Sequence, residues 1–179
     1  MVSRVESDAF FGTVLRLAYA ESEVGLRLMD GRSERIRLGA ARPTEFIVKT
    51  PVQEKNGAIR LDLEILSFDL VGHSKTLWPG AQIRATAGAA AGPDAQPVYG
   101  TVRFAAGRTI EQGATTEVHL WLQLKIPLGL VRNGRAIRMK GVVHGIPPEG
   151  VRFESQNDAP LLDRNGRVVG TLSACLNEL

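Results

Sequence analysis

The sequence predicts an all-β fold, either an antiparallel β-sandwich or a flattened β-barrel of about eight to ten strands. Four Asx-Gly dipeptides separate its segments, and this dipeptide is the strongest short-range signal of a β-hairpin. They are Asp30-Gly31, Asn56-Gly57, Asn133-Gly134 and Asn165-Gly166. The segments between them alternate in polarity. In EVHLWLQLKI, residues 117–126, every second side chain is aliphatic, as in a strand with one buried face.

The 179 residues fit a single β domain, residues 1–179, which is large enough to bury roughly two thirds of its unfolded surface. The pattern of polar and apolar residues is least informative about secondary structure over residues 1–44. FFGTVLRLAYA, around residues 9–20, fits a short helix as well as a strand, and we favour strands. EVGLRLMDGRSERIRL has the pattern of a hairpin around Asp30-Gly31.

The longest predicted strand, residues 58–71, carries a phase slip. Its aliphatic residues fall on odd positions up to Ile65 and on even positions from Leu66. One extra residue in a strand has this effect, so we expect a β-bulge and a bend there. Further strands are predicted near residues 45–49, 82–87, 98–104, 136–144, 151–154 and 166–174, with a Gly- and Ala-rich loop over 85–97 and a connection over 72–80.

Composition excludes several classes of protein. A single cysteine, no apolar leader and no apolar run of roughly 20 residues indicate a soluble cytoplasmic protein without a membrane segment. The net charge of +3 is small, and most basic residues alternate with acidic ones, which disfavours nucleic acid as a partner. We interpret the basic cluster in LVRNGRAIRMK, residues 130–140, as a solvated hairpin tip.

NDAPLLDRNGRVVGTL, residues 157–172, shares its turn chemistry with the segment that follows the nucleophile of trypsin-like proteases. Counting back from Pro160, however, places Asn157 where the serine is required. We therefore disfavour a serine protease and interpret the stretch as a C-terminal hairpin. The sequence also lacks a phosphate-binding loop, paired metal-ligand spacings and a Gly-x-Ser-x-Gly elbow. Asp62 and Glu64 share one face of the long strand. Two such acids could act as general acid and base if they faced a barrel cavity, and they are equally typical of a charged stripe on the surface of a sheet.

Face parity gathers candidate binding residues on the outside of the sheet. Glu117, His119 and Trp121 share one face, and Lys140 and His144 share the outer face of residues 136–144. If Asn133-Gly134 joins the two strands, one register sets His119 opposite His144. The other sets Glu117 opposite His144 and Trp121 opposite Lys140. His119 and His144 are also candidate metal ligands, but no third ligand can be assigned, so solvated sheet residues are favoured. No cofactor is predicted.

Three segments, LDLEILSFDLVGHSKTLWPG (61–80), HGIPPEGVRFES (144–155) and PLLDRNGRVVGTL (160–172), resemble an uncharacterised bacterial family of short β-rich proteins, a domain of unknown function. The resemblance covers about residues 45–175 and implies no catalytic residues. Independently of it, the two prolines of Ile146-Pro147-Pro148 exclude a central strand and favour a tight turn, for which a cis bond at one proline is an option.

Two functions fit these features. The first is a non-enzymatic binding or assembly module that presents the outer face, or the loops with Trp78 and the Ile-Pro-Pro turn, to an unknown partner. The alternative is a lipocalin-like or cyclase-like barrel that binds or transforms a hydrophobic small molecule, and a continuous apolar pocket would favour it. A symmetric homodimer is one way to cover edge strands. Enzymatic activity is left open, with the balance against it.

Overall fold

The computed structural model describes residues 11–18, 20–148 and 150–177, and it confirms the all-β prediction. The strands are β1 (Val14–Leu17), β2 (Glu21–Leu28), β3 (Ser33–Ala40), β4 (Thr44–Val48), β5 (Val52–Gln53), β6 (Ile59–His73), β7 (Gln82–Gly88), β8 (Val98–Phe104), β9 (Ala114–Leu120), β10 (Gln123–Ile126), β11 (Gly129–Asn133), β12 (Ile137–Val143), β13 (Phe153–Ser155), β14 (Ala159–Leu162) and β15 (Val168–Asn177). Two single-turn 3-10 helices, η1 (Ala89–Ala91) and η2 (Ile110–Gln112), lie in the connections. No helix among the described residues is long and apolar enough to cross a membrane.

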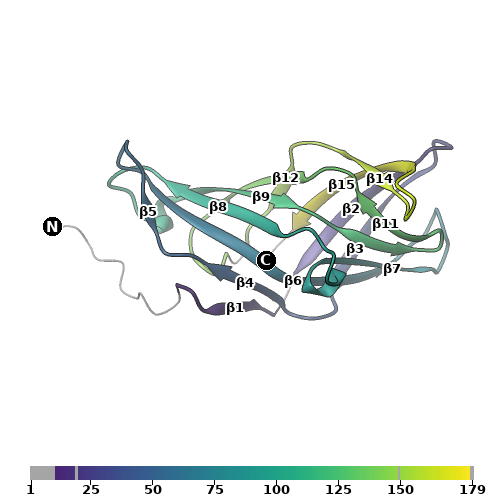
Figure 1. Cartoon of the computed structure of the whole chain (residues 1–179), viewed down its shortest axis with the longest axis horizontal. Helices are drawn as coiled ribbons and strands as arrows, with labels where there is room; N and C mark the ends of the chain where they lie inside the picture. The colour runs from purple at the N-terminus through teal and green to yellow at the C-terminus, as the bar shows by residue number, and fades with distance from the viewer. Residues whose placement is uncertain (1–10, 19, 149, 178–179) are drawn as a thin grey trace.

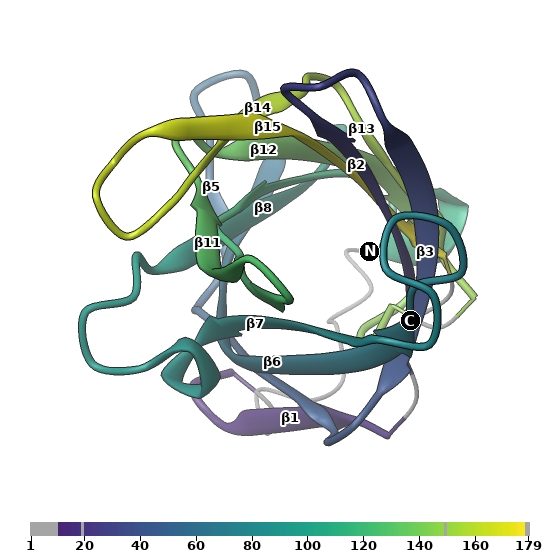
Figure 2. The same ribbon diagram turned by 90° about the vertical axis from the view of Figure 1, so that its right-hand side faces the viewer.

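The sheet closes into an antiparallel barrel, so of the two predicted architectures the barrel is the observed one. Eight strands form a ring in the order β6, β7, β10, β11, β14, β15, β2 and β3, and β3 pairs back to β6. The ring is visible end-on in Figure 2. The remaining strands extend it lengthwise or lie outside it. In Figure 1, β4, β5 and β8 lie towards one end of the long axis, and β3, β7 and β11 towards the other.

Three of the four Asx-Gly dipeptides lie in hairpin turns, as predicted. They join β2 to β3, β5 to β6 and β14 to β15. In each turn the amide of the glycine donates to the carbonyl three residues earlier, and the glycine has a positive φ. The glycine therefore follows the two central residues of the turn, which is the pattern of a type I turn with a left-handed residue after it.

The fourth dipeptide, Asn133-Gly134, was wrongly predicted to be a turn. The hairpin between the neighbouring strands β10 and β11 turns instead at Pro127-Leu128, where Ile126 pairs with Gly129. Asn133 is buried at the end of β11. The predicted strand over residues 117–126 is consequently split into β9 and β10, although Val118, Leu120, Leu122, Leu124 and Ile126 all point inward as expected.

The predicted bulge is confirmed, and it belongs to a belt of interruptions around the barrel. On β6, Ser67 pairs with Glu45 and Ile65 with Phe46, so that Leu66 is the extra residue. At the same height the neighbouring strands are interrupted between β3 and β4, β7 and β8, β9 and β10, β11 and β12, and β13 and β14. Among the described strands, β6 and β15 pair with strands on both sides of this level and so continue through it. We call this level the belt, meaning residues 41–43, 66, 89–97, 121–122, 134–136 and 156–158.

Side chains of two asparagines replace ladder hydrogen bonds in the belt. Asn133 accepts from the Leu122 amide at 2.6 Å and donates to the carbonyls of Leu120 at 3.0 Å and Arg135 at 2.7 Å. Asn157 accepts from the Arg138 amide at 2.9 Å and donates to the Ala136 carbonyl at 3.2 Å. Asn157 stands where the nucleophilic serine would be in the trypsin-like pattern. Its side chain instead holds the backbone at the start of β12 through these hydrogen bonds.

The belt separates a filled half of the barrel from a half with a pocket. Aliphatic side chains fill the half formed by β2, β3, β7, β10, β11 and β14. Among them Leu26, Ile36, Leu38, Ile83, Leu124 and Leu161 are fully buried. At the N-terminus, Val14–Leu17 form β1 on the edge of β4, so this part of the ambiguous segment is a strand. Residues 9, 10 and 19 lie outside the described residues.

Candidate functional site

Three of the residues predicted to form an outer patch do come together. Lys140 pairs with Glu117 across β12 and β9, and Arg138 pairs with His119. His119 Nε2 lies 2.9 Å from Glu117 Oε1, and Lys140 Nζ lies 3.5 Å from Glu117 Oε2. The hydrogen bond with His119 lowers the pKa of Glu117, and Lys140 adds to the effect against the cost of partial burial. These side chains satisfy one another at an exposed surface, where such pairs contribute little to stability.

His144 and Trp121 do not join this patch, because both predicted registers were wrong. His144 lies beyond the paired residues of β12, and its Nδ1 is 3.1 Å from the carbonyl oxygen of Glu111. Trp121 lies in the belt and, with Gln123 and Arg132, lines a groove beside residues 91–96. Within the part of the chain that the structure describes, no three His, Cys, Asp or Glu side chains are placed to share a metal ion.

Trp78 has a structural environment at the filled end of the barrel. It is half-buried against the core, next to the buried Leu77. The loop that carries both residues is held by Glu34 of β3. Its carboxylate accepts hydrogen bonds from the Ser74 hydroxyl and from three amides at 2.6–3.1 Å, those of Lys75, Thr76 and Leu77. Burial opposes ionisation of Glu34, but the hydrogen bonds outweigh it, and the pKa of Glu34 is lowered.

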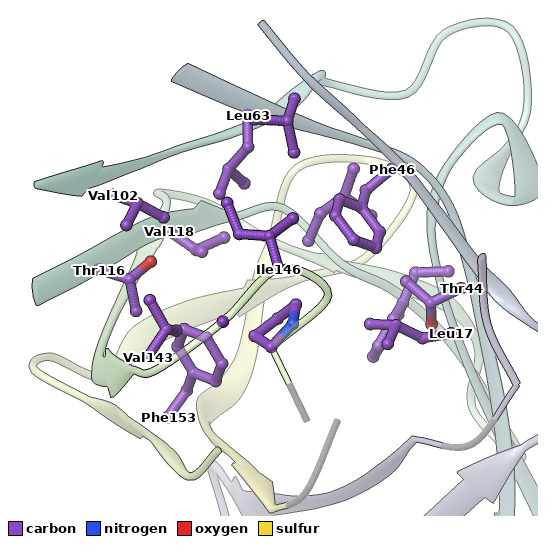
Figure 3. Close-up of a pocket in the computed structure, with 15 residues that line it drawn as sticks. Leu17, Thr44, Phe46, Leu63, Val102, Thr116, Val118, Val143, Ile146 and Phe153 are labelled. Atoms are coloured by element: carbon purple, nitrogen blue, oxygen red, sulfur yellow. The ribbon is translucent and has the colours of Figure 1, made fainter. Parts of the chain in front are cut away.

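An apolar pocket lies in the other half of the barrel interior (Figure 3). Strands β1, β4, β6, β8, β9, β12 and β13 contribute to it, together with the segment that follows β12. Its fifteen lining residues are uncharged: Leu17, Thr44, Phe46, Val48, Leu63, Ile65, Phe68, Val102, Thr116, Val118, Val143, Gly145, Ile146, Pro148 and Phe153. The volume open to the centre of a water molecule is about 50 Å³.

Small residues at inward positions of β8 and β9 leave room for the pocket. On β9 the inward side chains before Leu120 are Ala114, Thr116 and Val118. On β8 the inward positions include Val102 and Gly100, and a Cβ on Gly100 would collide with Leu63. In the filled half, leucine and isoleucine occupy several inward positions, such as Ile36, Leu38 and Leu124, although β7 has Ala85 and Ala87 there. Small inward residues on adjacent strands were the signal in the sequence that could have predicted this pocket. The alternation of polar and apolar residues alone did not predict it.

Ile146 and Pro148 fill part of the space between the strands that line the pocket. They belong to the predicted Ile-Pro-Pro turn, in which the Ile146–Pro147 bond is cis. Residues 145–148 form no hydrogen bond with the rest of the described chain. Apolar contacts and chain connectivity therefore hold this segment in the barrel mouth, whereas His144 before it is anchored to Glu111.

Two polar atoms at the pocket wall lack a partner. The hydroxyl oxygens of Thr44 and Thr116 are buried and form no hydrogen bond. The two residues are 3% and 2% exposed, respectively. Among the described residues, the only other buried side-chain atom without a hydrogen bond is Nε of Arg60, and this atom lies 3.0 Å from Asp62 in an ion pair. Both hydroxyls that lack any polar contact therefore lie at one site.

Comparisons with known proteins support the fold. No family model matches the chain, and no curated protein matches it. A solved structure, that of DynF from the dynemicin biosynthesis pathway of Micromonospora chersina, superposes with a TM-score of 0.71 at 17% identity. The match covers 97% of this chain and 90% of DynF. At this identity the similarity shows a shared barrel fold, and the resemblance to an uncharacterised bacterial family stays a prediction.

Proposed function

We propose that this protein binds an apolar small molecule in the pocket of its barrel, the second of the two functions that the sequence allowed. The observation that carries the proposal is an uncharged, mostly aliphatic pocket lined by β6 and by strands that extend the barrel lengthwise, beside a closed ring whose core is filled. Pockets with such linings bind ligands chiefly through burial of apolar surface. DynF, which has the same fold, comes from a biosynthetic pathway, a setting in keeping with small-molecule binding.

The ligand takes the space that Ile146 and Pro148 fill. With about 50 Å³ for water centres, the pocket holds about four water-sized groups, since one such group needs roughly 10–15 Å³ by this measure. A larger ligand requires these two side chains to leave the pocket. Their segment forms no hydrogen bond with the described part of the chain, and segments held in this way open at low free-energy cost.

The first choice made from sequence, an outer face that binds a partner, has less support. The outer cluster of Glu117, His119 and Lys140 consists of side chains that neutralise one another. Trp78 and Trp121, which were expected to mark an exposed surface, are both half-buried against the core.

Binding of the neutral fluorescent probe N-phenylnaphthylamine tests the proposal. We expect saturable fluorescence enhancement with the wild-type protein and its loss in Leu63→Trp, because Leu63 lines the pocket and the larger ring fills it. Glu64→Trp is the matched control, since Glu64 is the next residue on β6 and points to the other face, towards Lys49. Absence of saturable binding to the wild type, or equal binding by both variants, would refute the proposal.

A further inference from the structure

The inference concerns the chemistry of the ligand, so it rests on the proposed function. Thr44 and Thr116 are the only residues of the pocket lining with polar side chains. Each hydroxyl could otherwise have been replaced by a methyl group, as in valine, without a change of shape. A buried hydroxyl without a hydrogen bond destabilises a folded protein. Two of them at one pocket are therefore explained best by a partner that arrives with the ligand.

Water is a poor substitute for that partner. A buried water molecule typically makes about three hydrogen bonds. At either threonine it would find one hydroxyl among aliphatic and aromatic side chains, because the other lining residues have no polar side-chain atoms. Thr44 lies on β4 and Thr116 on β9, so no single water molecule reaches both.

Both hydroxyls can reach the pocket through rotation about one side-chain bond. At present each oxygen is covered by neighbouring atoms. The methyl and hydroxyl groups of threonine have similar size, and threonine exchanges between rotamers more readily than valine does. A rotation of χ1 by about 120° can place the hydroxyl where the methyl group was, while the methyl group moves to the former position of the hydrogen on Cβ. A ligand acceptor in the pocket would favour the rotamer that points the O–H at it.

The two hydroxyls are widely spaced. In Figure 3, Thr44 and Thr116 lie on opposite sides of the pocket with Ile146 between them. From β4 to β9 the sheet passes through β6 and β8. These three strand spacings amount to about 14 Å across the strands. The registers add an offset along the strands, because Glu45, next to Thr44, pairs with Ser67, whereas Thr116 is level with Leu61 through Val102. This spacing suits an elongated molecule rather than a compact one.

The lining also restricts the charge of the ligand. None of the fifteen lining residues carries a charge. A carboxylate or an amine inside the pocket would be a buried charge without a counter-ion. The free-energy cost of burying such a charge is far larger than the gain from one hydrogen bond with threonine. Ketone, quinone and ester carbonyls accept a hydrogen bond from a hydroxyl without this cost.

We propose that the pocket takes neutral, elongated molecules with an apolar body and a hydrogen-bond acceptor, such as a ketone carbonyl, near each end. Thr44 and Thr116 would donate hydrogen bonds to these acceptors. A fatty acid, which has the same apolar body, would be disfavoured by its carboxylate.

Competition against N-phenylnaphthylamine with matched compounds tests this inference on the full chain. The compounds are a linear diketone with a carbonyl near each end and the alkane and carboxylic acid of equal chain length. We expect the diketone to bind more tightly than either analogue at pH 7. Thr44→Val and Thr116→Val should each weaken diketone binding about tenfold, as expected for one hydrogen bond, and leave alkane binding unchanged.

Two further variants control for shape and folding. Thr44→Ser and Thr116→Ser keep the hydroxyl and should keep diketone affinity within about threefold, since they lose only one methyl group's contacts. Thr115→Val, on the exposed face of β9, should have no effect. If alkane, acid and diketone compete equally and both valine variants bind the diketone normally, the inference is wrong while the pocket remains a binding site. If neither probe nor competitors bind the wild type, the proposed function itself fails.

Discussion

Replacement of Asn133 should destabilise the barrel far more than replacement of any other asparagine of an Asn-Gly pair. Its side chain forms three hydrogen bonds with backbone groups of Leu120, Leu122 and Arg135. In Asn133→Ala, the amide of Leu122 and the carbonyl of Leu120 lose this partner in a buried site. Each unsatisfied buried group costs about 1–3 kcal/mol, so we expect a loss of about 3 kcal/mol in the free energy of unfolding.

Asn133→Asp separates hydrogen bonding from shape. One carboxylate oxygen can still accept from Leu122, but the other would face the carbonyls of Leu120 and Arg135, which now accept from the amide nitrogen. This repulsion should raise the pKa of the introduced aspartate in the folded state. Its penalty is therefore absent below the unfolded-state pKa of about 3.9, grows as pH rises above that value, and is complete above the folded-state pKa.

Urea unfolding of both variants between pH 3 and pH 8 measures these effects. Asn165→Ala is the control, because Asn165 is exposed in the β14–β15 turn and its side chain makes none of the hydrogen bonds identified in the structure. Asn133→Asp should approach wild-type stability at acid pH and lose it towards neutrality. A cost for Asn133→Ala no greater than that for Asn165→Ala, or a pH-independent cost for Asn133→Asp, would refute the role assigned to this side chain.

Three further substitutions test other contacts. Asp69→Asn should lower the free energy of unfolding at pH 7 by about 1–3 kcal/mol, because the buried Asp69 accepts hydrogen bonds at 2.7 and 2.5 Å from Arg84. The Arg84 hydrogen bond lowers the pKa of Asp69, so wild-type stability should fall as pH drops below about 4 and the variant should fall less in urea titrations over that range. Glu34→Gln should cost about 1–3 kcal/mol by the same measurement, since its NH2 group would face either the amides of Lys75 and Thr76 or the amide of Leu77 and the Ser74 hydroxyl, and unchanged stability would contradict this account. Gly88→Ala should cost more than 1 kcal/mol in thermal unfolding, because Gly88 has a φ of +57° and a Cβ there would collide with the Leu66 carbonyl, whereas Gly107→Ala has room for the Cβ and controls for the positive φ alone.

Local patterns predicted the fold well where one segment decided the structure. The phase slip at Leu66 predicted the bulge, because burial alternates strictly along a strand. Three Asx-Gly pairs predicted hairpins, because the dipeptide suits the turn itself. Asn133-Gly134 failed for a reason outside the segment. The buried belt offered its side chain an amide and two carbonyls, and these contacts replaced the turn.

That one error explains why the predicted site residues were only partly brought together. Placing the turn at Asn133-Gly134 still gave the correct face of the sheet for each side chain. The predicted and observed registers both pair odd-numbered residues of one strand with even-numbered residues of the other, so the same side chains share a face. The real register sets His119 opposite Arg138 rather than His144. The pocket could not be predicted by parity at all, because its size depends on small residues of separate strands and on how far Ile146 and Pro148 enter it.

The belt relates these observations to the proposed function. Where adjacent strands are interrupted at one level, β6 and β15 connect the two halves of the barrel, together with side-chain hydrogen bonds such as those of Asn133 and Asn157. The filled half supplies most of the large buried side chains. The other half can consequently carry small inward residues, unsatisfied hydroxyls and a segment that has no hydrogen bond with the rest of the described chain, each of which lowers stability. These features lie together around one pocket, where a ligand would compensate for all three.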